Sequence, residues 1–141
     1  MRAPRWYFDA DTIGVGKLLQ DARRDVTWPG DDGIRRRPHN YQIPCPVKET
    51  DTKDPVWIPI VASAGMTIIT RDKKIQTRTA EINAIKDASA RMFAITSDEV
   101  LDRWGLLEVV VSQWRAMERV VDETPGPFIY SLTRTALRRL I

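Results

Sequence analysis

Along the chain, short apolar runs alternate with longer stretches in which apolar residues recur at the spacing of a helix. The clearest strand pattern is Met66-Thr67-Ile68-Ile69-Thr70, a nearly continuous apolar run that is typical of a strand buried on both faces of a parallel sheet. Apolar or aromatic runs predict four more strands, at residues 5–9, 25–28, 91–95 and 128–130.

In most of the segments between these strands, apolar residues recur at the spacing of a helix. A helix is expected over residues 12–23 and another over 77–90. Asp54-Pro55 predicts a tight turn, with the main helix running from about Pro59 to Gly65, because a proline as deep as Pro59 disfavours one helix from Asp54. Thr96 and Glu99 have the spacing of a capping box, so the last helical stretch is expected to start there and to break near Gly105. Apolar residues from Leu106 to Val121 follow the 3.6-residue period, which favours a core face and leaves open a dimer surface.

This order of elements predicts an α/β fold with a mostly parallel central sheet and helices on both faces. The 141 residues correspond to one domain, 1–141. Prolines and glycines crowd residues 29–53 and predict an irregular loop of a length that is usually functional or mobile. Residues 131–141 are expected to form a basic tail.

Composition excludes several classes of protein. With 43% apolar and 29% charged residues the chain is not expected to be disordered, and no apolar stretch is long enough to span a bilayer. The single cysteine, Cys45, excludes an internal disulfide, and the start of the chain lacks a signal-peptide core, so a cytoplasmic location is expected. Neither His39 nor Cys45 lies in a recognisable catalytic pattern.

The net charge of +3 permits contact with nucleic acid but does not argue for it. Arg35, Arg36 and Arg37 lie in a stretch without acids and are compatible with contacts to RNA backbone, contacts to an acidic partner, or plain solvation.

Acidic residues follow the ends of two predicted strands. Asp9 and Asp11 come after the first strand and Asp72 after the central one, while Asp54 begins a predicted turn that leads back toward the same edge. In open parallel sheets ligands bind beyond the carboxyl ends of the strands, so these carboxylates are candidates for one pocket. Repulsion among them would be relieved by a hard divalent cation such as Mg²⁺ or Mn²⁺, which indicates phosphoryl chemistry. The alternative is that each acid caps a helix or ends a strand for local reasons.

Three segments together resemble a known family. Phe8-Asp9-Ala10-Asp11, then Asp54-Pro55-Val56-Trp57-Ile58-Pro59, then Ile68-Ile69-Thr70-Arg71-Asp72 are similar to the PIN-like nucleases, and most to the VapC-type toxin branch with its D-x-x-W-I-P segment before an I-x-T-x-D strand end. The likeness covers roughly residues 5–96. It implies a single PIN-like domain that cleaves RNA with a divalent metal, Mg²⁺ or Mn²⁺, and often acts as the toxin of a toxin–antitoxin pair.

The resemblance also implies roles for individual residues. Asp9, Asp54 and Asp72 match the catalytic and metal-binding acids, and Asp11 stands where relatives often carry an amide, so it joins the expected metal ligands. Glu49 and Asp51 compete with Asp54 for the middle position, and no fourth carboxylate is expected after Asp72, because Lys73 and Lys74 come next and no acid follows until Glu81.

Basic side chains beside this site are the expected contacts to substrate. Arg71, Lys73 and Lys74 flank Asp72 and are expected to hold RNA phosphates, although a solvated loop is the alternative. A cognate antitoxin protein is the expected partner, a homodimer remains open, and no membrane partner is expected.

Two other functions remain open at this stage. A PIN-like fold without activity could bind RNA or a protein, and the missing fourth carboxylate supports that reading. A phosphotransfer receiver domain also clusters acids at strand ends, but it needs a lysine after its last parallel strand, and none follows residues 128–132 here.

Overall fold

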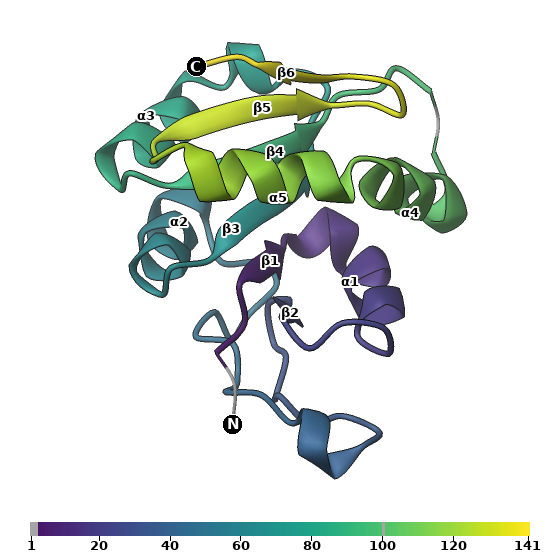
Figure 1. The fold of residues 1–141 in the computed structure, drawn as a ribbon. Coiled ribbons are helices and arrows are strands. Elements are labelled where there is room, and N and C mark those ends of the chain that lie inside the picture. Colours follow the sequence, from purple (N-terminus) through teal and green to yellow (C-terminus); the bar gives the residue numbers. More distant parts are fainter. Residues whose placement is uncertain (1–2, 100) are drawn as a thin grey trace.

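The computed structural model describes residues 3–99 and 101–141 and contains one six-stranded sheet flanked by helices (Figure 1). The strand order is β2-β1-β3-β4-β5-β6, and neighbouring strands are parallel except for the antiparallel pair β5–β6. The strands are β1 (Trp6–Phe8), β2 (Val26–Thr27), β3 (Thr67–Arg71), β4 (Arg91–Ile95), β5 (Phe128–Leu132) and β6 (Leu137–Arg139). The predicted α/β class and mostly parallel sheet are confirmed.

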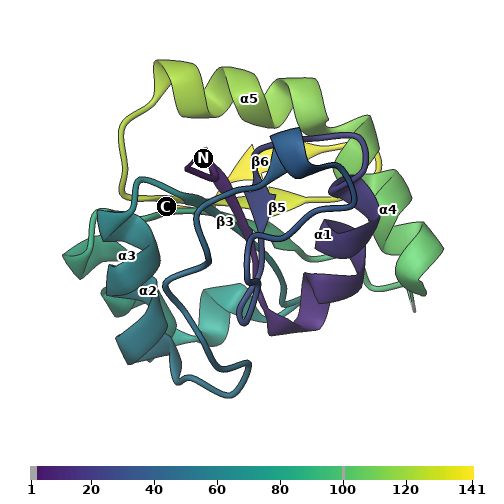
Figure 2. The same cartoon turned by 90° about the horizontal axis from the view of Figure 1, so that it is seen from below.

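Helices cover both faces of the sheet (Figure 2). The helices are α1 (Ile13–Leu19), α2 (Asp54–Ser63), α3 (Thr79–Asp87), α4 (Arg103–Ser112) and α5 (Trp114–Glu123). Alternating strand residues divide between two cores: Trp6 and Phe8 pack with α1, α4 and α5, whereas Tyr7 packs with α2 and α3. This division follows from the two-residue repeat of a strand, which sends successive side chains to opposite faces.

Three predicted element boundaries are wrong. Helix α2 begins at Asp54 and passes through Pro59, whose ring is accommodated on an exposed side of the helix. Helix α4 begins at Arg103 rather than near Thr96, because the Asp102 side chain accepts a hydrogen bond from the Gly105 N–H at 2.8 Å. The break between the last two helices falls at Gln113 instead of Gly105.

The segment expected as a basic tail, residues 131–141, contains the end of β5 and the whole of β6. Residues 137–139 pair with 130–132 in an antiparallel hairpin, so β6 closes one edge of the sheet. The exposed Arg138 and Arg139 stand on this strand. The basic residues are therefore presented by a fixed edge strand.

Residues 29–53 are irregular, as predicted, apart from one 3₁₀ turn at Pro38–Asn40. A buried ion pair holds this loop: both terminal nitrogens of Arg35 donate to the Asp31 carboxylate at 2.8 and 2.9 Å. Asp31 also accepts from the Gly33 N–H and from the Thr27 hydroxyl, which ties the loop to β2. These polar contacts anchor the first half of the loop, and the buried Cys45 and Val47 pack with core residues of α2 and α3.

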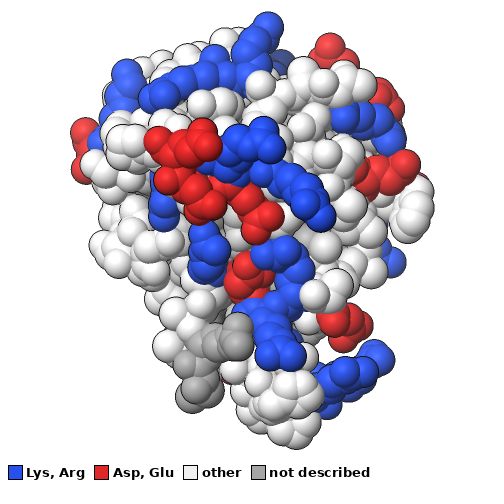
Figure 3. Space-filling view, viewed as in Figure 1, with Lys and Arg blue, Asp and Glu red and all other residues white. Residues whose placement is uncertain are grey.

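Acidic and basic side chains are interspersed on the face that α5 covers, with basic groups gathered along the rim near β6 (Figure 3). Among the described residues, no helix has the length and apolar character that crossing a membrane requires.

Candidate metal centre

The first two acids of the site follow β1 in a tight turn. The Asp9 carboxylate caps the 3₁₀ turn Ala10–Thr12 by accepting a hydrogen bond from the Ala10 N–H at 2.7 Å. The Asp9 N–H donates to the Ile69 carbonyl at 3.0 Å, and the buried Thr12 hydroxyl lies 3.1 Å from the same oxygen. The end of β1 is therefore fixed against β3, which places Asp9 and Asp11 at the carboxyl edge of the sheet.

Thr70, near the end of β3, connects these two acids. Its buried hydroxyl lies 3.1 Å from Oδ2 of Asp9 and 3.4 Å from Oδ1 of Asp11. The Arg71 N–H also approaches Oδ1 of Asp11 at 3.4 Å. A β-branched hydroxyl residue at this strand position therefore both packs in the sheet and orients two carboxylates.

Asp72 comes directly after β3, and both of its carboxylate oxygens accept hydrogen bonds. Oδ1 accepts from the Lys74 N–H at 2.9 Å, and Oδ2 accepts from Nε of Arg78 at 3.2 Å. The Asp72 carboxylate is mostly shielded from solvent, whereas the Arg78 side chain is 55% exposed. The Arg78 contact can therefore open without disturbing the core.

Asp54 reaches the site from the other face of the sheet, as the first residue of α2. The indole Nε1 of Trp57 donates to Oδ1 of Asp54 at 2.9 Å, and the Trp57 ring stacks on Tyr7 of β1 with centroids 5.2 Å apart. Burial raises the pKa of the Tyr7 phenol, so it remains neutral. Asp54 is thus held against the first strand by a buried aromatic pair.

These four acids and a fifth, Glu81, line one pocket of about 350 Å³ at the carboxyl ends of β1 and β3. Glu81 lies in the first turn of α3, and the 3₁₀ turn at Ile75–Thr77 brings the chain back toward the strand ends before that helix begins. The expectation that the chain after Asp72 supplies no further carboxylate is wrong, because Glu81 lines the pocket. An acid in the first turn of the helix after β3 was the available signal, and its distance along the chain from Asp72 concealed it.

The pocket concentrates negative charge. Desolvation raises the pKa of Asp11 to about 6, with a further contribution from the charge of Asp9. Burial, and then repulsion from Asp54, Asp72 and Asp9, raises the pKa of Glu81 to about 7. Burial also raises the pKa of Asp9, against the hydrogen bonds that lower it. Asp11 and Glu81 therefore hold protons at a pH where isolated acids are ionised, which is the behaviour of a site that favours a cation.

The geometry of the pocket does not suit direct coordination of one metal ion by three or more carboxylates. Within residues 3–99 and 101–141, no group of three or more acidic, histidine or cysteine side chains is close enough to hold one metal ion. Mg²⁺ keeps several of its waters and is commonly bound through one or two carboxylates. The donors in this pocket, all carboxylate oxygens, fit such a hydrated hard cation.

The alternatives for the middle acid lie outside this pocket. Asp51 lines a neighbouring pocket of about 380 Å³ that shares Asp54 and Glu81 with the first, and Glu49 is exposed. Asp54 is therefore the middle acid that the fold brings to Asp9.

The basic residues near Asp72 differ in their contacts. Arg71 lines the pocket, but its guanidinium donates to the carbonyls of Glu99 and Leu101, both at 3.1 Å. Lys73 and Lys74 are exposed. Arg78, which was not singled out from the sequence, lines the pocket beside the acids.

His39 and Cys45 lie away from the acids. His39 is exposed in the turn Pro38–Asn40, and Cys45 is buried as a free thiol. After β5, where a receiver domain needs a lysine, the structure has Thr133 and then Arg134, which pairs with Glu108 at 3.1 Å.

Residues 45–97 match the family model of a PIN like domain. The matched segment is less than half of the chain and contains Asp54, Asp72 and Glu81 together with β3 and β4. The match supports a PIN-like domain, a class whose members are typically nucleases, and does not distinguish the VapC branch. Comparison with curated proteins and with solved structures gives no significant match.

Proposed function

We propose that the protein is a metal-dependent endoribonuclease that hydrolyses RNA phosphodiester bonds. The observation that carries the proposal is the convergence of Asp9, Asp11, Asp54, Asp72 and Glu81 on one pocket at the carboxyl edge of a parallel sheet. The partial match to a PIN like domain supports the same reading.

Asp9, Asp11, Asp54 and Asp72 are proposed to hold hydrated Mg²⁺ or Mn²⁺, one or two of them directly and the others through its waters, with Glu81 as the additional carboxylate from α3. The bound cation would supply an activated water and would offset charge on the scissile phosphate. Thr70 orients Asp9 and Asp11, and Trp57 orients Asp54, so the chain fixes three of the acids before any ligand arrives.

Substrate phosphates are assigned to the exposed cations beside the acids. Lys73 and Lys74 remain proposed phosphate contacts, and Arg78 joins them because its guanidinium lies in the pocket and is largely exposed. Arg71, which lines the pocket, is also a proposed phosphate contact. Its hydrogen bonds to the carbonyls of Glu99 and Leu101 also hold the segment before α4.

The toxin of a type II toxin–antitoxin pair, acting in the cytoplasm, is the proposed biological role, and it rests on the sequence motifs that resemble the VapC branch. An antitoxin would then have to block the acidic pocket, and a basic side chain placed among the carboxylates would do so. For a homodimer, the exposed Val111 lies within the apolar stretch from Leu106 to Val121, and Trp104 is exposed on the same helix.

The test is cleavage of a structured RNA by purified protein with Mg²⁺ or Mn²⁺. We expect cleavage that stops on chelation and is lost in Asp9→Asn, while Glu123→Gln at the exposed end of α5 retains activity. Cleavage that resists chelation and survives Asp9→Asn would contradict the proposal.

The second candidate is an inactive PIN-like module that binds RNA or a protein. It is favoured by one observation, that no three acids among the described residues are placed for direct metal coordination. Titration with Mn²⁺ separates the two functions, because the module should show neither saturable Mn²⁺ binding nor cleavage of any RNA.

A further inference from the structure

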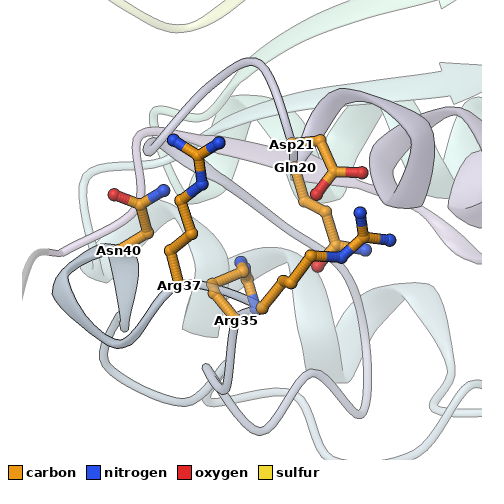
Figure 4. Close-up of a pocket in the computed structure, with 6 residues that line it drawn as sticks. Gln20, Asp21, Arg35, Arg37 and Asn40 are labelled. Carbon is orange, nitrogen blue, oxygen red and sulfur yellow. The ribbon is translucent and has the colours of Figure 1, made fainter.

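A second polar pocket lies at the other end of α1 from the acids. It measures about 230 Å³ and is lined by Gln20, Asp21, Arg35, Arg36, Arg37 and Asn40. Figure 4 shows Gln20 and Asp21, which follow α1, facing the loop that carries the arginines. We call this the arginine pocket, and no residue of it lines the acidic pocket.

Arg35 gives the arginine pocket a rigid floor. Its side chain is 3% exposed, pairs with Asp31, donates to the Val26 carbonyl at 3.1 Å and lies over the Trp28 ring at 4.9 Å. Both terminal nitrogens of its guanidinium are therefore occupied by the protein itself, while Nε is buried without a hydrogen-bond partner. The consequence is that the next two residues of the loop are held in place without a helix or strand.

Arg36 and Arg37 are exposed and are not used by the fold. In the part of the chain that the structure describes, neither guanidinium makes a hydrogen bond or an ion pair, although Asp21 lines the same pocket. The side-chain oxygen of Asn40 is buried without a hydrogen-bond partner. Figure 4 shows the Asn40 NH₂ group on the side of Arg37, where it can donate to an anion in the pocket.

We propose that the arginine pocket binds a backbone phosphate of the RNA substrate several nucleotides from the scissile bond. The inference rests on the proposed function and extends it. The segment from Ala10 to Leu19, which separates the two pockets, is helical and spans about 15 Å at 1.5 Å per residue. About four stacked nucleotides cover that distance at 3.4 Å each.

The lining of the arginine pocket favours phosphate over an acidic protein. All six lining residues are polar or charged, whereas protein interfaces are more than half apolar in area. Guanidinium groups match phosphate oxygens with paired hydrogen bonds. The one opposing charge, Asp21, limits the affinity and supplies a means of testing the site.

The experiment measures binding of two RNA oligonucleotides of the same repeated sequence, 3 and 10 nucleotides long, by fluorescence anisotropy in Ca²⁺, a hard cation that offsets the charge of the acidic pocket. Only the longer RNA can reach both pockets. We expect Arg36→Ala/Arg37→Ala to weaken binding of the 10-mer about tenfold and of the 3-mer less than about twofold, and to lower the slope of log affinity against log salt by about 1.4 for two lost contacts.

The matched control is Arg138→Ala/Arg139→Ala, which removes the same charge from β6 at the opposite edge of the sheet. It should change binding of both lengths equally. Asp21→Asn should tighten binding of the 10-mer, a gain that a folding defect cannot produce.

Equal losses at both lengths, the same loss in the control, or no change in either variant would overturn the inference. The inference would also be overturned if Arg36→Ala/Arg37→Ala kept its binding of the 10-mer but lost binding of an acidic protein. Because this assay needs no cleavage, failure of the proposed nuclease activity is recognised separately, as absence of cleavage by the wild type with Mn²⁺.

Discussion

At the scale of single residues, Glu81 is the acid whose environment is least favourable to its charge. Burial and three neighbouring aspartates raise its pKa to about 7. Replacing it with glutamine removes that repulsion, so Glu81→Gln should raise the melting temperature in chelator at pH 8 by about 3 °C. Mn²⁺ affinity, measured by calorimetry, should fall about tenfold.

Glu123→Gln, at the exposed end of α5, is the control for loss of a negative charge. A lower melting temperature for Glu81→Gln, with unchanged Mn²⁺ affinity, would make Glu81 a structural residue of α3 and would remove it from the site.

The sequence predicts the surroundings of some site residues but not of others. Asp9 and Asp72 were predictable because a strand end and a following acid are adjacent in sequence. Glu81 was not, since its approach depends on a 3₁₀ turn that no motif marks. Trp104 and Trp114 both fall in helical patterns of the sequence, but Trp104 is 66% exposed and Trp114 is buried.

At the scale of elements, α2 positions its acid through one indole. Trp57→Phe keeps an aromatic ring against Tyr7 but removes the hydrogen bond to Asp54. We expect the melting temperature to change little, while Mn²⁺ affinity and RNA cleavage fall about tenfold or more. Equal losses of stability and metal binding would mean that Trp57 acts only as a core residue.

A buried ion pair between Arg35 and Asp31 anchors the first half of the loop of residues 29–53. Arg35→Ala leaves the Asp31 carboxylate, 1% exposed, without its cation, so the free energy of unfolding should drop by about 3–5 kcal/mol. Denaturant unfolding measures this. Arg36→Ala, on the exposed neighbour, should change it by less than about 0.5 kcal/mol. Similar small effects of both substitutions would show that the pair does not hold the loop.

The strands were predicted better than the helix starts, for a physical reason. A buried strand is visible in the sequence as an apolar run. The run at residues 66–70 predicts β3, which extends from Thr67 to Arg71. Helix starts depend on which local cap prevails: Asp102 caps α4, while the Thr96 and Glu99 pair does not. Strand β6 was missed because an edge strand with exposed arginines lacks any apolar run.

At the scale of the whole molecule, the order of strands decides where the acids meet. The class and the mostly parallel sheet follow from alternating strand and helix patterns, but the order β2-β1-β3 depends on long-range pairing that no local pattern specifies. With this order the chain connections leave β1 and β3 in opposite directions, and ligand sites form at such a point. Asp9 and Asp72 follow these two neighbouring strands.

The acidic pocket should make the stability of the metal-free protein depend on pH in an unusual direction. The pKa values of Asp11 and Glu81 are raised to about 6 and about 7, so between about pH 4 and pH 7 the folded chain holds protons that the unfolded chain has released. When the folded state binds more protons, the free energy of unfolding falls as pH rises. The contribution of these two groups is therefore greatest in acid and is lost as pH passes through their folded-state values.

Asp11→Asn/Glu81→Gln should abolish this component, so the melting temperature of the double variant minus that of the wild type, measured in chelator, should grow from pH 5 to pH 8. Saturating Mg²⁺ should stabilise the wild type more at pH 8 than at pH 5, because the ionised carboxylates bind the cation. A difference that stays constant with pH, or that shrinks, would mean that these carboxyls are ionised throughout and that the pocket carries no excess of negative charge for a metal to neutralise.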